Sequence, residues 1–301
     1  MKNVLVLRLS ALGDVIHTLP AVAALREHAR ITWVVEAPYR ELVELVAGVD
    51  TIPVRLKKWL KSPIAHRSDL RAMFGALRGR FDEAIDFQGL IKSATLMRFS
   101  GAPIRIAFDA DAIREKPAGW FANRRVHVDT TKHVIEQNLQ LAGVEARAGD
   151  WSRYPQNNGF DDLAGAIVLL PGAGKPSKLW PIERFREIAK RIGDRALAVW
   201  GPGEREMAEA MGARVAPPTN LRELAWILQH ASVVIGADTG PLHLADALGT
   251  KVIALYGPTD PRRNGPYTQL DHCIDHFRGS KSMESISVEE VMNTLGRVLA
   301  E

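Results

Sequence analysis

The sequence predicts an α/β protein made of two doubly wound, Rossmann-like domains, and three observations support this fold class. Short β-type apolar runs alternate with amphipathic segments along the whole chain. The first run, Val4 to Leu9, is apolar at nearly every position, as expected for a parallel strand covered on both faces. The 301 residues exceed what one hydrophobic core usually serves, and a stretch rich in Gly, Asn, Asp, Arg and Pro, residues 143–165, divides them.

The pattern predicts elements in both halves, and we expect domains at residues 1–150 and 151–301. Strands are predicted at residues 4–9, 31–36, 84–87, 104–108, 166–170, 196–200, 233–236 and 251–256. Helices are predicted at residues 15–28, 39–46, 68–78, 182–192, 221–230 and 287–299. The last helix opens on a capping box, Ser287 with Glu290, and could pack on its own domain or return to the first.

Composition limits the possible classes of protein. Apolar residues make up 46% and charged residues 25%, ordinary values for a soluble globular protein. No run reaches the roughly 18 apolar residues of a membrane span, and the N-terminal apolar run is too short for a secretory signal. We therefore expect a cytoplasmic protein. Cys273 is the only cysteine, which excludes an intramolecular disulfide and a cysteine-based zinc cluster. The net charge of +4 is too small to indicate nucleic-acid binding, and no reader motif is present.

The turn after the first strand carries an acid, in Ser10-Ala11-Leu12-Gly13-Asp14. Gly13 would allow a tight or left-handed turn and would place Asp14 at a helix N-terminus. The spacing alone favours an N-cap, because Asp is a preferred capping residue. A carboxylate at the carboxyl end of a parallel strand also suits a general base, whereas it would repel a phosphate. Both interpretations remain open at this point.

Three loops of the second half each have features of an anion site. The run from Gly172 to Lys178 is Gly-rich and contains two lysines, although a solvated loop would look the same. The runs 238–243 and 257–261 follow strands and contain Gly-Pro turns that leave backbone N–H groups open. His243 could equally be a packed histidine. Together the three loops indicate a nucleotide diphosphate pocket better than any one of them does alone.

A basic run in the first half surrounds Trp59. It consists of Arg55, Lys57, Lys58, Lys61, His66 and Arg67, and Arg114 adds charge in the same half. Such a run is often only a solvated face. It also suits a multiply anionic acceptor or an anionic membrane surface.

Five motifs, in order through the chain, resemble those of the lipopolysaccharide heptosyltransferases, glycosyltransferase family 9. They are residues 10–20 (SALGDVIHTLP), 85–94 (IDFQGLIKSA), 178–181 (KLWP), 238–243 (DTGPLH) and 256–261 (YGPTDP). Residues 114–117 and 123–124 are most similar to members that add the first heptose to Kdo of the lipid A core.

The resemblance implies a GT-B fold with two domains facing a central cleft, the first binding acceptor and the second ADP-heptose. It implies inverting transfer of L-glycero-D-manno-heptose from ADP-heptose to Kdo-lipid A, without metal or cofactor, at the cytoplasmic face of the inner membrane. Asp14 would be the base that deprotonates the acceptor hydroxyl. The donor would be bound by Lys178, Glu204, Thr219, Asp238, Thr239, Gly240, Leu242 and His243. The acceptor would be bound by Lys57, Lys58, Lys61 and Arg114.

Other functions remain open on the sequence alone. A related transferase with another acceptor or nucleotide-heptose donor would carry the same motifs. A non-catalytic nucleotide- or lipid-binding module would keep the basic run and the pocket, with Asp14 only a helix cap. A nicotinamide dehydrogenase is disfavoured, because the G-x-G-x-x-G fingerprint is absent.

Overall fold

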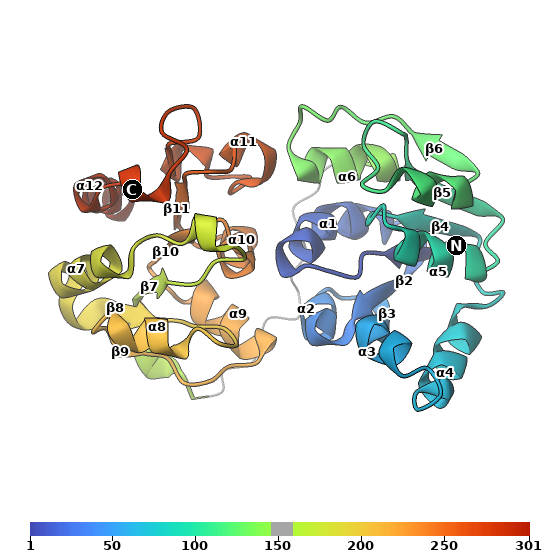
Figure 1. Ribbon diagram of the computed structural model, residues 1–301, viewed down its shortest axis with the longest axis horizontal. Coiled ribbons are helices and arrows are strands. Elements are labelled where there is room, and N and C mark those ends of the chain that lie inside the picture. The colour runs from blue at the N-terminus through green and yellow to red at the C-terminus, as the bar shows by residue number, and fades with distance from the viewer. Residues whose placement is uncertain (146–158) are drawn as a thin grey trace. The chain divides into compact units, whose positions relative to one another are not determined.

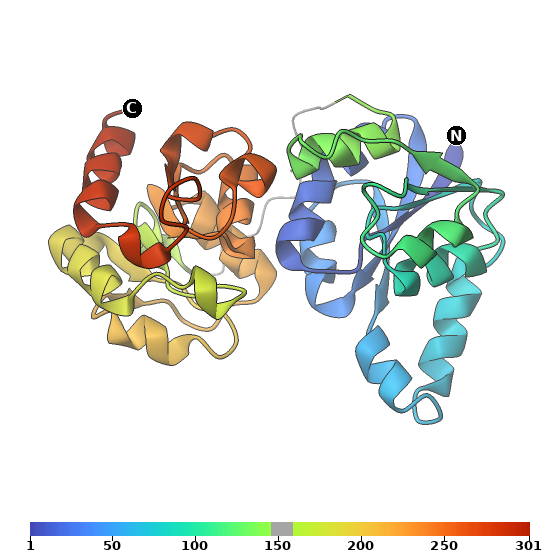
Figure 2. The ribbon, with the colours of Figure 1, turned by 45° about the horizontal axis from the view of Figure 1, so that its top comes forward.

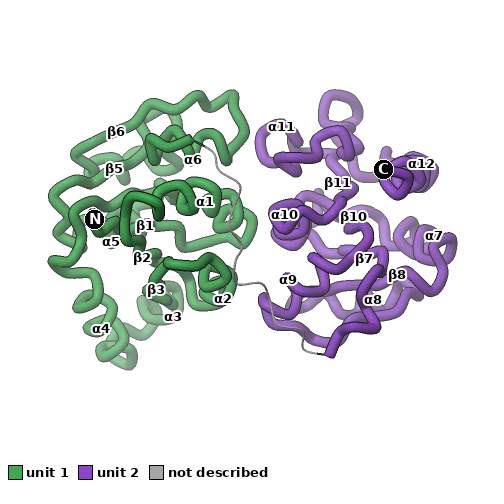
Figure 3. The backbone as a smooth tube through the Cα atoms, turned by 180° about the vertical axis from the view of Figure 1, so that it is seen from behind, with its two compact units in different colours: residues 1–153 green, residues 154–301 purple. Residues whose placement is uncertain are grey.

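The computed structural model describes residues 1–145 and 159–301 (Figure 1). The chain divides into two compact units, Met1–Arg153 and Tyr154–Glu301 (Figure 3). The boundary falls within residues 143–165, where the sequence predicts a linker, and the middle of that stretch lies outside the described residues. Helix α6 ends at Ala142, and Gly143 follows it in the left-handed conformation that glycine favours at this position.

The first unit holds a parallel sheet of six strands in the order β3-β2-β1-β4-β5-β6. The strands are β1 (Lys2–Leu7), β2 (Ala29–Glu36), β3 (Val49–Val54), β4 (Glu83–Asp86), β5 (Ile104–Phe108) and β6 (Arg124–Val126). All pairs are parallel, and β1 pairs with β2 on one side and with β4 on the other. This is the strand order of the dinucleotide-binding fold, so the predicted doubly wound class is confirmed.

Helices cover both faces of this first sheet. They are α1 (Leu12–Leu25), α2 (Arg40–Val43), α3 (Leu56–Lys61), α4 (Arg67–Leu77), α5 (Ile91–Phe99) and α6 (Val134–Ala142), with 3-10 turns η1 (Ala37–Tyr39) and η2 (Lys116–Phe121). Helix α1 packs beside α6, whereas α5 packs beside α4 and η2. Figure 2 shows these two groups on opposite sides of the sheet.

The second unit repeats the same topology. Its strands are β7 (Ile167–Leu170), β8 (Ala196–Ala198), β9 (Arg214–Val215), β10 (Val233–Ala237), β11 (Val252–Tyr256) and β12 (Cys273–Asp275). They are parallel in the order β12-β11-β10-β7-β8-β9. Numbered from its own first strand, this is again a 3-2-1-4-5-6 sheet, which explains the two similar alternating halves of the sequence.

The helices of the second unit include a long terminal helix. They are α7 (Ile182–Ile192), α8 (Arg205–Ala210), α9 (Leu221–Gln229), α10 (Gly240–Ala247), α11 (Pro261–Asn264) and α12 (Val288–Ala300). The predicted capping box of α12 is present, because Ser287 accepts from the N–H of Glu290 and Glu290 accepts from that of Ser287. Helix α12 contacts α7, β10 and β11, and it places Val291, Leu295 and Val298 in the core of the second unit.

Each sheet has a switch point, where its strand order reverses. In the first unit this point lies between β1 and β4, and in the second between β7 and β10. Ligands of doubly wound folds bind beyond the carboxyl ends of the strands at such points. Most residues that the sequence singled out follow these four strands.

Candidate active site

Asp14 lies in the first turn of α1 but does not cap it. The N-cap residue is Ala11, no side chain caps the helix, and Asp14 is the third helical residue. Gly13 is the second helical residue, so the prediction of a tight or left-handed turn there is wrong. The capping interpretation of Asp14 is wrong too, because its side chain is committed to ion pairs.

Arg8, the residue after β1, is the first ion-pair partner of Asp14. Its guanidinium is buried, with Nη2 at 2.9 Å from Asp14 Oδ1, and it also donates to the Phe87 carbonyl. Burial lowers the pKa of Arg8 to about 10, while the negative charge of Asp14 opposes that shift. A buried guanidinium is costly unless it is paired, so Arg8 fixes the place of the carboxylate. The sequence analysis missed Arg8, although a charge ending an apolar strand was a visible signal.

Arg114 is the second partner. Its Nη2 lies 3.0 Å from both carboxylate oxygens of Asp14. Arg114 comes from the loop after β5, whose backbone runs against Gly89: a Cβ on Gly89 would lie 3.2 Å from the Arg114 nitrogen. Gly89 also has φ +66°, which favours glycine. The proposed base and one proposed acceptor residue therefore meet at the switch point of the first sheet.

The segment after β4 holds this site together. Gln88 Oε1 accepts from the N–H groups of Leu9 and Ser10 at 2.8 and 3.2 Å, and its Nε2 donates to the Ser10 carbonyl at 2.9 Å. Asp86 accepts from the N–H groups of Gln88 and Gly89 and from the Ser93 hydroxyl. Burial raises the pKa of Asp86 to about 6, although these hydrogen bonds and Arg8 oppose the shift.

The other proposed acceptor residues gather beyond β2 and β3. Lys57, Lys58 and Lys61 line a depression of about 360 Å³ together with Glu36, Pro38 and Arg55. All three lysines are exposed on α3. Glu36 is the acid at this place, and its partial burial raises its pKa while Lys92 and Arg55 oppose the shift. Because its other charged side chains are all basic, the depression would attract an anionic ligand from solution.

In the second unit, Lys178 and Asp238 form a salt bridge across the switch point. Lys178 ends the 3-10 turn η4 (Pro176–Lys178) after β7, and Asp238 follows β10. Lys178 Nζ lies 2.5 Å from Asp238 Oδ2, and both side chains are largely buried. Of the two lysines in the Gly-rich loop, Lys178 is thus held in a largely buried salt bridge, whereas Lys175 is exposed.

Two further side chains contact Asp238. His243 Nε2 lies 3.0 Å from Oδ1, and Asn264 Nδ2 donates to the same oxygen at 2.9 Å. Burial alone would raise the pKa of Asp238, but the hydrogen bonds and charges of His243 and Lys178 outweigh it and hold the pKa well below its usual value. Asn264, from α11, was not predicted. Asn264 lies just beyond the third loop, residues 257–261, in which Asp260 caps α11.

The start of α10 offers donors beside this salt bridge. Thr239 is the N-cap, its side chain makes no capping hydrogen bond, and Gly240 and Pro241 open the helix. Within the described part of the chain, the buried Thr239 hydroxyl has no hydrogen-bond partner. Leu242 is fully buried, so only its backbone can serve a ligand. A helix N-terminus of this kind attracts anions, and the adjacent lysine adds a full positive charge.

Glu204 is positioned by two glycines. Its Oε2 accepts from the Gly201 N–H at 2.8 Å, and its carboxylate occupies the place that a Cβ on Gly172 would take, 1.9–2.3 Å away. Glu204 therefore lies beside the loop after β7. Thr219 is partly buried in the segment between β9 and α9, and within the described residues no hydrogen bond or ion pair joins it to the residues above.

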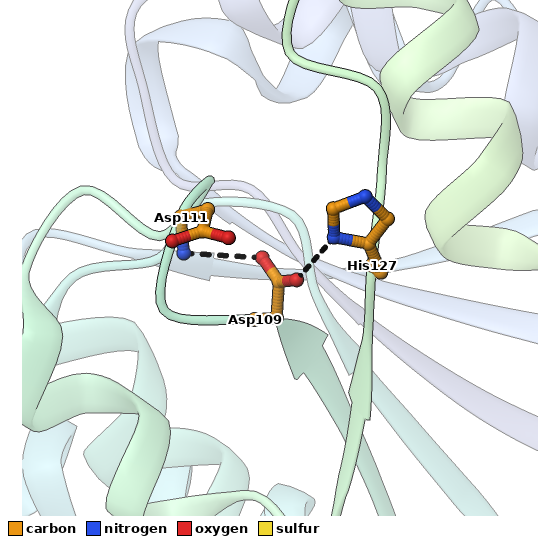
Figure 4. A group of neighbouring side chains, drawn as sticks. All are labelled: Asp109, Asp111 and His127. Atoms are coloured by element: carbon orange, nitrogen blue, oxygen red, sulfur yellow. Dashed lines mark hydrogen bonds and ion pairs between the residues drawn. The ribbon is translucent and has the colours of Figure 1, made fainter.

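A separate cluster in the first unit has metal-ligand chemistry. Asp109, Asp111 and His127 each offer one ligand atom, and these atoms lie within 4.8 Å of one another (Figure 4). Asp109 is already engaged, because one oxygen accepts from the N–H groups of Asp111 and Ala112 and the other contacts His127 Nδ1 at 2.7 Å. The geometry is that of a hydrogen-bonded turn with an exposed ion pair, and we assign it no ligand.

The structure is that of a two-unit, Rossmann-like protein with polar sites at the switch points where such folds bind nucleotides: Asp14 paired with Arg8 in the first unit, and Lys178 paired with Asp238 in the second. The model of glycosyltransferase family 9 (heptosyltransferase) matches residues 70–292. The chain belongs to this family, and it is a glycosyltransferase with the GT-B fold.

Similar proteins come from several bacteria. Lipopolysaccharide heptosyltransferase 1 of Escherichia coli K12 is 31% identical over 88% of this chain and 91% of its own length. The Pseudomonas aeruginosa protein of the same name is 33% identical over 88% of this chain and 81% of its own. The structure of E. coli heptosyltransferase WaaC with ADP is 28% identical, with a TM-score of 0.87 over 98% of this chain and 99% of that one. E. coli heptosyltransferase II, at 22% identity and a TM-score of 0.78, shares the fold.

Proposed function

We propose that the protein transfers L-glycero-D-manno-heptose from ADP-heptose to Kdo of Kdo-lipid A, with inversion and without a metal ion. The observation that carries this proposal is the fixed Asp14 carboxylate, since a base must be held where an acceptor hydroxyl can reach it. Relatives named lipopolysaccharide heptosyltransferase 1, at 31–33% identity, support the sugar and the pathway. So does the WaaC structure described with ADP-2-deoxy-2-fluoro heptose.

The reaction is a single displacement at the anomeric carbon. Asp14 takes the proton of the Kdo hydroxyl as its oxygen forms the new glycosidic bond, and the bond to the ADP oxygen breaks. Arg114 binds the carboxylate of the acceptor near Asp14, and Arg8 stays buried and holds the base in place. Attack from the face opposite the departing ADP inverts the configuration.

The second unit binds the donor. Negative charge develops on the departing diphosphate, and Lys178 with the N–H groups at Thr239, Gly240 and Leu242 stabilises it, as a metal does in other transferases. Asp238 and His243 hold the heptose and orient Lys178. Glu204 accepts from the ribose hydroxyls and Thr219 borders the adenine.

The basic depression of α3 binds the anionic groups of the acceptor. Lys57, Lys58 and Lys61 face phosphates and carboxylates of Kdo-lipid A, and the acceptor places the enzyme at the cytoplasmic face of the inner membrane as a peripheral protein. None of the helices in the described residues is long and apolar enough to cross a bilayer.

Transfer from ADP-heptose to two acceptors tests the proposal. We expect heptosylation of heptose-free Kdo-lipid A, at a rate that EDTA does not lower. The heptose should have the opposite anomeric configuration in the product from that in the donor, as inversion requires. No transfer to this acceptor, together with transfer to one that already carries a heptose, would instead indicate the reaction of heptosyltransferase II. Loss of activity in EDTA, restored by a divalent ion, would contradict the metal-independent step.

A further inference from the structure

Leu60 and Ile64 are exposed apolar side chains at the tip of the helical hairpin formed by α3 and α4. Leu60 in the last turn of α3 is 64% exposed, and Ile64 in the connecting turn is 84% exposed. Soluble proteins expose single apolar residues often. Leu60 and Ile64 differ from such single residues, because they lie four positions apart beside one turn and among basic side chains.

The hairpin is firmly folded beneath this tip. Leu56 and Trp59 of α3 and Met73 and Leu77 of α4 are buried in the core of the first unit. The turn closes with backbone hydrogen bonds from Ser62 to Trp59, from His66 to Ser62 and from Arg67 to Ile64. The exposure of Leu60 and Ile64 is therefore a property of an ordered element.

Basic side chains surround the tip. Residues 55–71 contain six lysines and arginines and a single acid, Asp69. The whole protein has a net charge of only +4, so this short segment accounts for its entire positive excess. The basic members are Arg55, Lys57, Lys58, Lys61, Arg67 and Arg71. All six are exposed, whereas His66 in the same segment is partly buried.

We propose that this tip inserts into an anionic phospholipid bilayer, with Leu60 and Ile64 in the interfacial region and the basic side chains at the headgroups. Apolar side chains flanked by Lys and Arg are the pattern by which peripheral proteins bind such surfaces. The two contributions differ in their response to salt, because screening weakens the charge attraction but not the burial of apolar surface. The inference rests on the proposed function in that the acceptor is a membrane lipid, and it adds a means of attachment beyond the lysines.

Vesicle binding measured without donor or acceptor tests the insertion. With vesicles of about 30% phosphatidylglycerol, we expect Leu60→Ser/Ile64→Ser to bind at least about tenfold more weakly than the wild type. In about 0.5 M NaCl the wild type should keep part of its binding and the variant should lose it. The matched control is Leu270→Ser/Leu299→Ser, two side chains of the second unit that are each 42% exposed. It should bind like the wild type.

Transfer to detergent-dispersed acceptor separates this inference from the proposed function. The Leu60→Ser/Ile64→Ser variant should keep its rate in detergent, whereas failure of the proposed function would show as no transfer by any form. As a second readout, an NBD label on Ile64→Cys in a Cys273→Ser background should shift to shorter wavelength with vesicles, and the same label on Leu299→Cys should not. No vesicle binding by the wild type, an equal loss in the control pair, or an unshifted label at position 64 would overturn the proposal.

Discussion

Arg114 Nη2 bridges both carboxylate oxygens of Asp14 at 3.0 Å, although one hundred positions separate the two residues in the chain. The buried Arg8 also contacts Oδ1 of this carboxylate, at 2.9 Å. Asp14 is therefore held by two guanidinium groups, of which that of Arg8 is buried and that of Arg114 is 44% exposed. An acceptor carboxylate that binds Arg114 would loosen its hold on Asp14 where the base is needed.

Lys178 and Lys175 provide a matched pair in one loop. Lys178 is held by Asp238, whereas Lys175 is exposed. If Lys178 stabilises the departing diphosphate, Lys178→Ala should lower kcat/KM by about 10²–10³-fold and weaken ADP binding. Lys175→Ala should change both within about twofold. Steady-state kinetics and calorimetric titration with ADP measure this, and equal effects of the two substitutions would refute a specific role for Lys178.

Gly172 and Gly174 provide a second pair. A Cβ on Gly172 would collide with the Glu204 carboxylate, whereas a Cβ on Gly174 meets nothing within 4 Å. Gly172→Ala should displace Glu204 and weaken ADP binding by about five- to tenfold, the cost of roughly one hydrogen bond to the ribose. Gly174→Ala should leave ADP affinity unchanged. Unaltered affinity in Gly172→Ala would show that Glu204 does not contact the nucleotide.

Asp86 should make the protein less stable as pH rises. Its folded-state pKa of about 6 lies above the unfolded value of 3.8, so the stabilisation is complete below 3.8 and is lost as pH rises through about 6. The loss amounts to about 3 kcal/mol for this fully buried group. In Asp86→Asn this part of the pH dependence should be absent. Denaturant unfolding at about pH 4 and pH 7 decides the matter, and parallel pH profiles for the two proteins would contradict the assignment.

Asp238 should have the opposite effect in a more acidic range. Its pKa is depressed in the folded state, so its stabilisation is fully present above the unfolded value of 3.8 and is lost as pH falls further. Asp238→Asn should be less stable than the wild type at neutral pH, and the difference should shrink toward about pH 3. A difference that stays constant over this range would show that the ion pair with Lys178 contributes no net stability.

The sequence predicted elements well where the pattern was local. The strand at residues 104–108 and the helix at residues 182–192 have the predicted bounds, because each is a clear run of one period. Strand β3, Val49–Val54, was missed because Asp50 and Pro53 interrupt its apolar pattern. The segment nevertheless forms a strand, because it pairs with β2.

The site was predictable as a list of residues and not as a set of contacts. Asp14, Lys178 and Asp238 stand in motifs, so the resemblance identified them. Arg8 was missed although its partner Asp14 lies only six positions further along the chain. Asn264 was missed because its contact with Asp238, 26 positions away, depends on how the loops after β10 and β11 come together. The N-cap interpretation of Asp14 failed because α1 begins at Leu12, three residues earlier than an N-cap at Asp14 would require.

The rate of heptose transfer by Asp14→Asn tests the central claim most directly. Asparagine keeps the shape and a hydrogen bond to Arg8 but cannot take the proton, so the unfolding free energy should fall by only about 1–3 kcal/mol. At a temperature where the variant remains folded by circular dichroism, the account predicts a loss of about 10²–10⁴-fold in kcat with ADP affinity within about twofold of the wild type. Glu41→Gln, an acid in the first turn of α2, is the matched control and should keep full activity. An Asp14→Asn variant that is folded and transfers heptose at the wild-type rate would contradict the account.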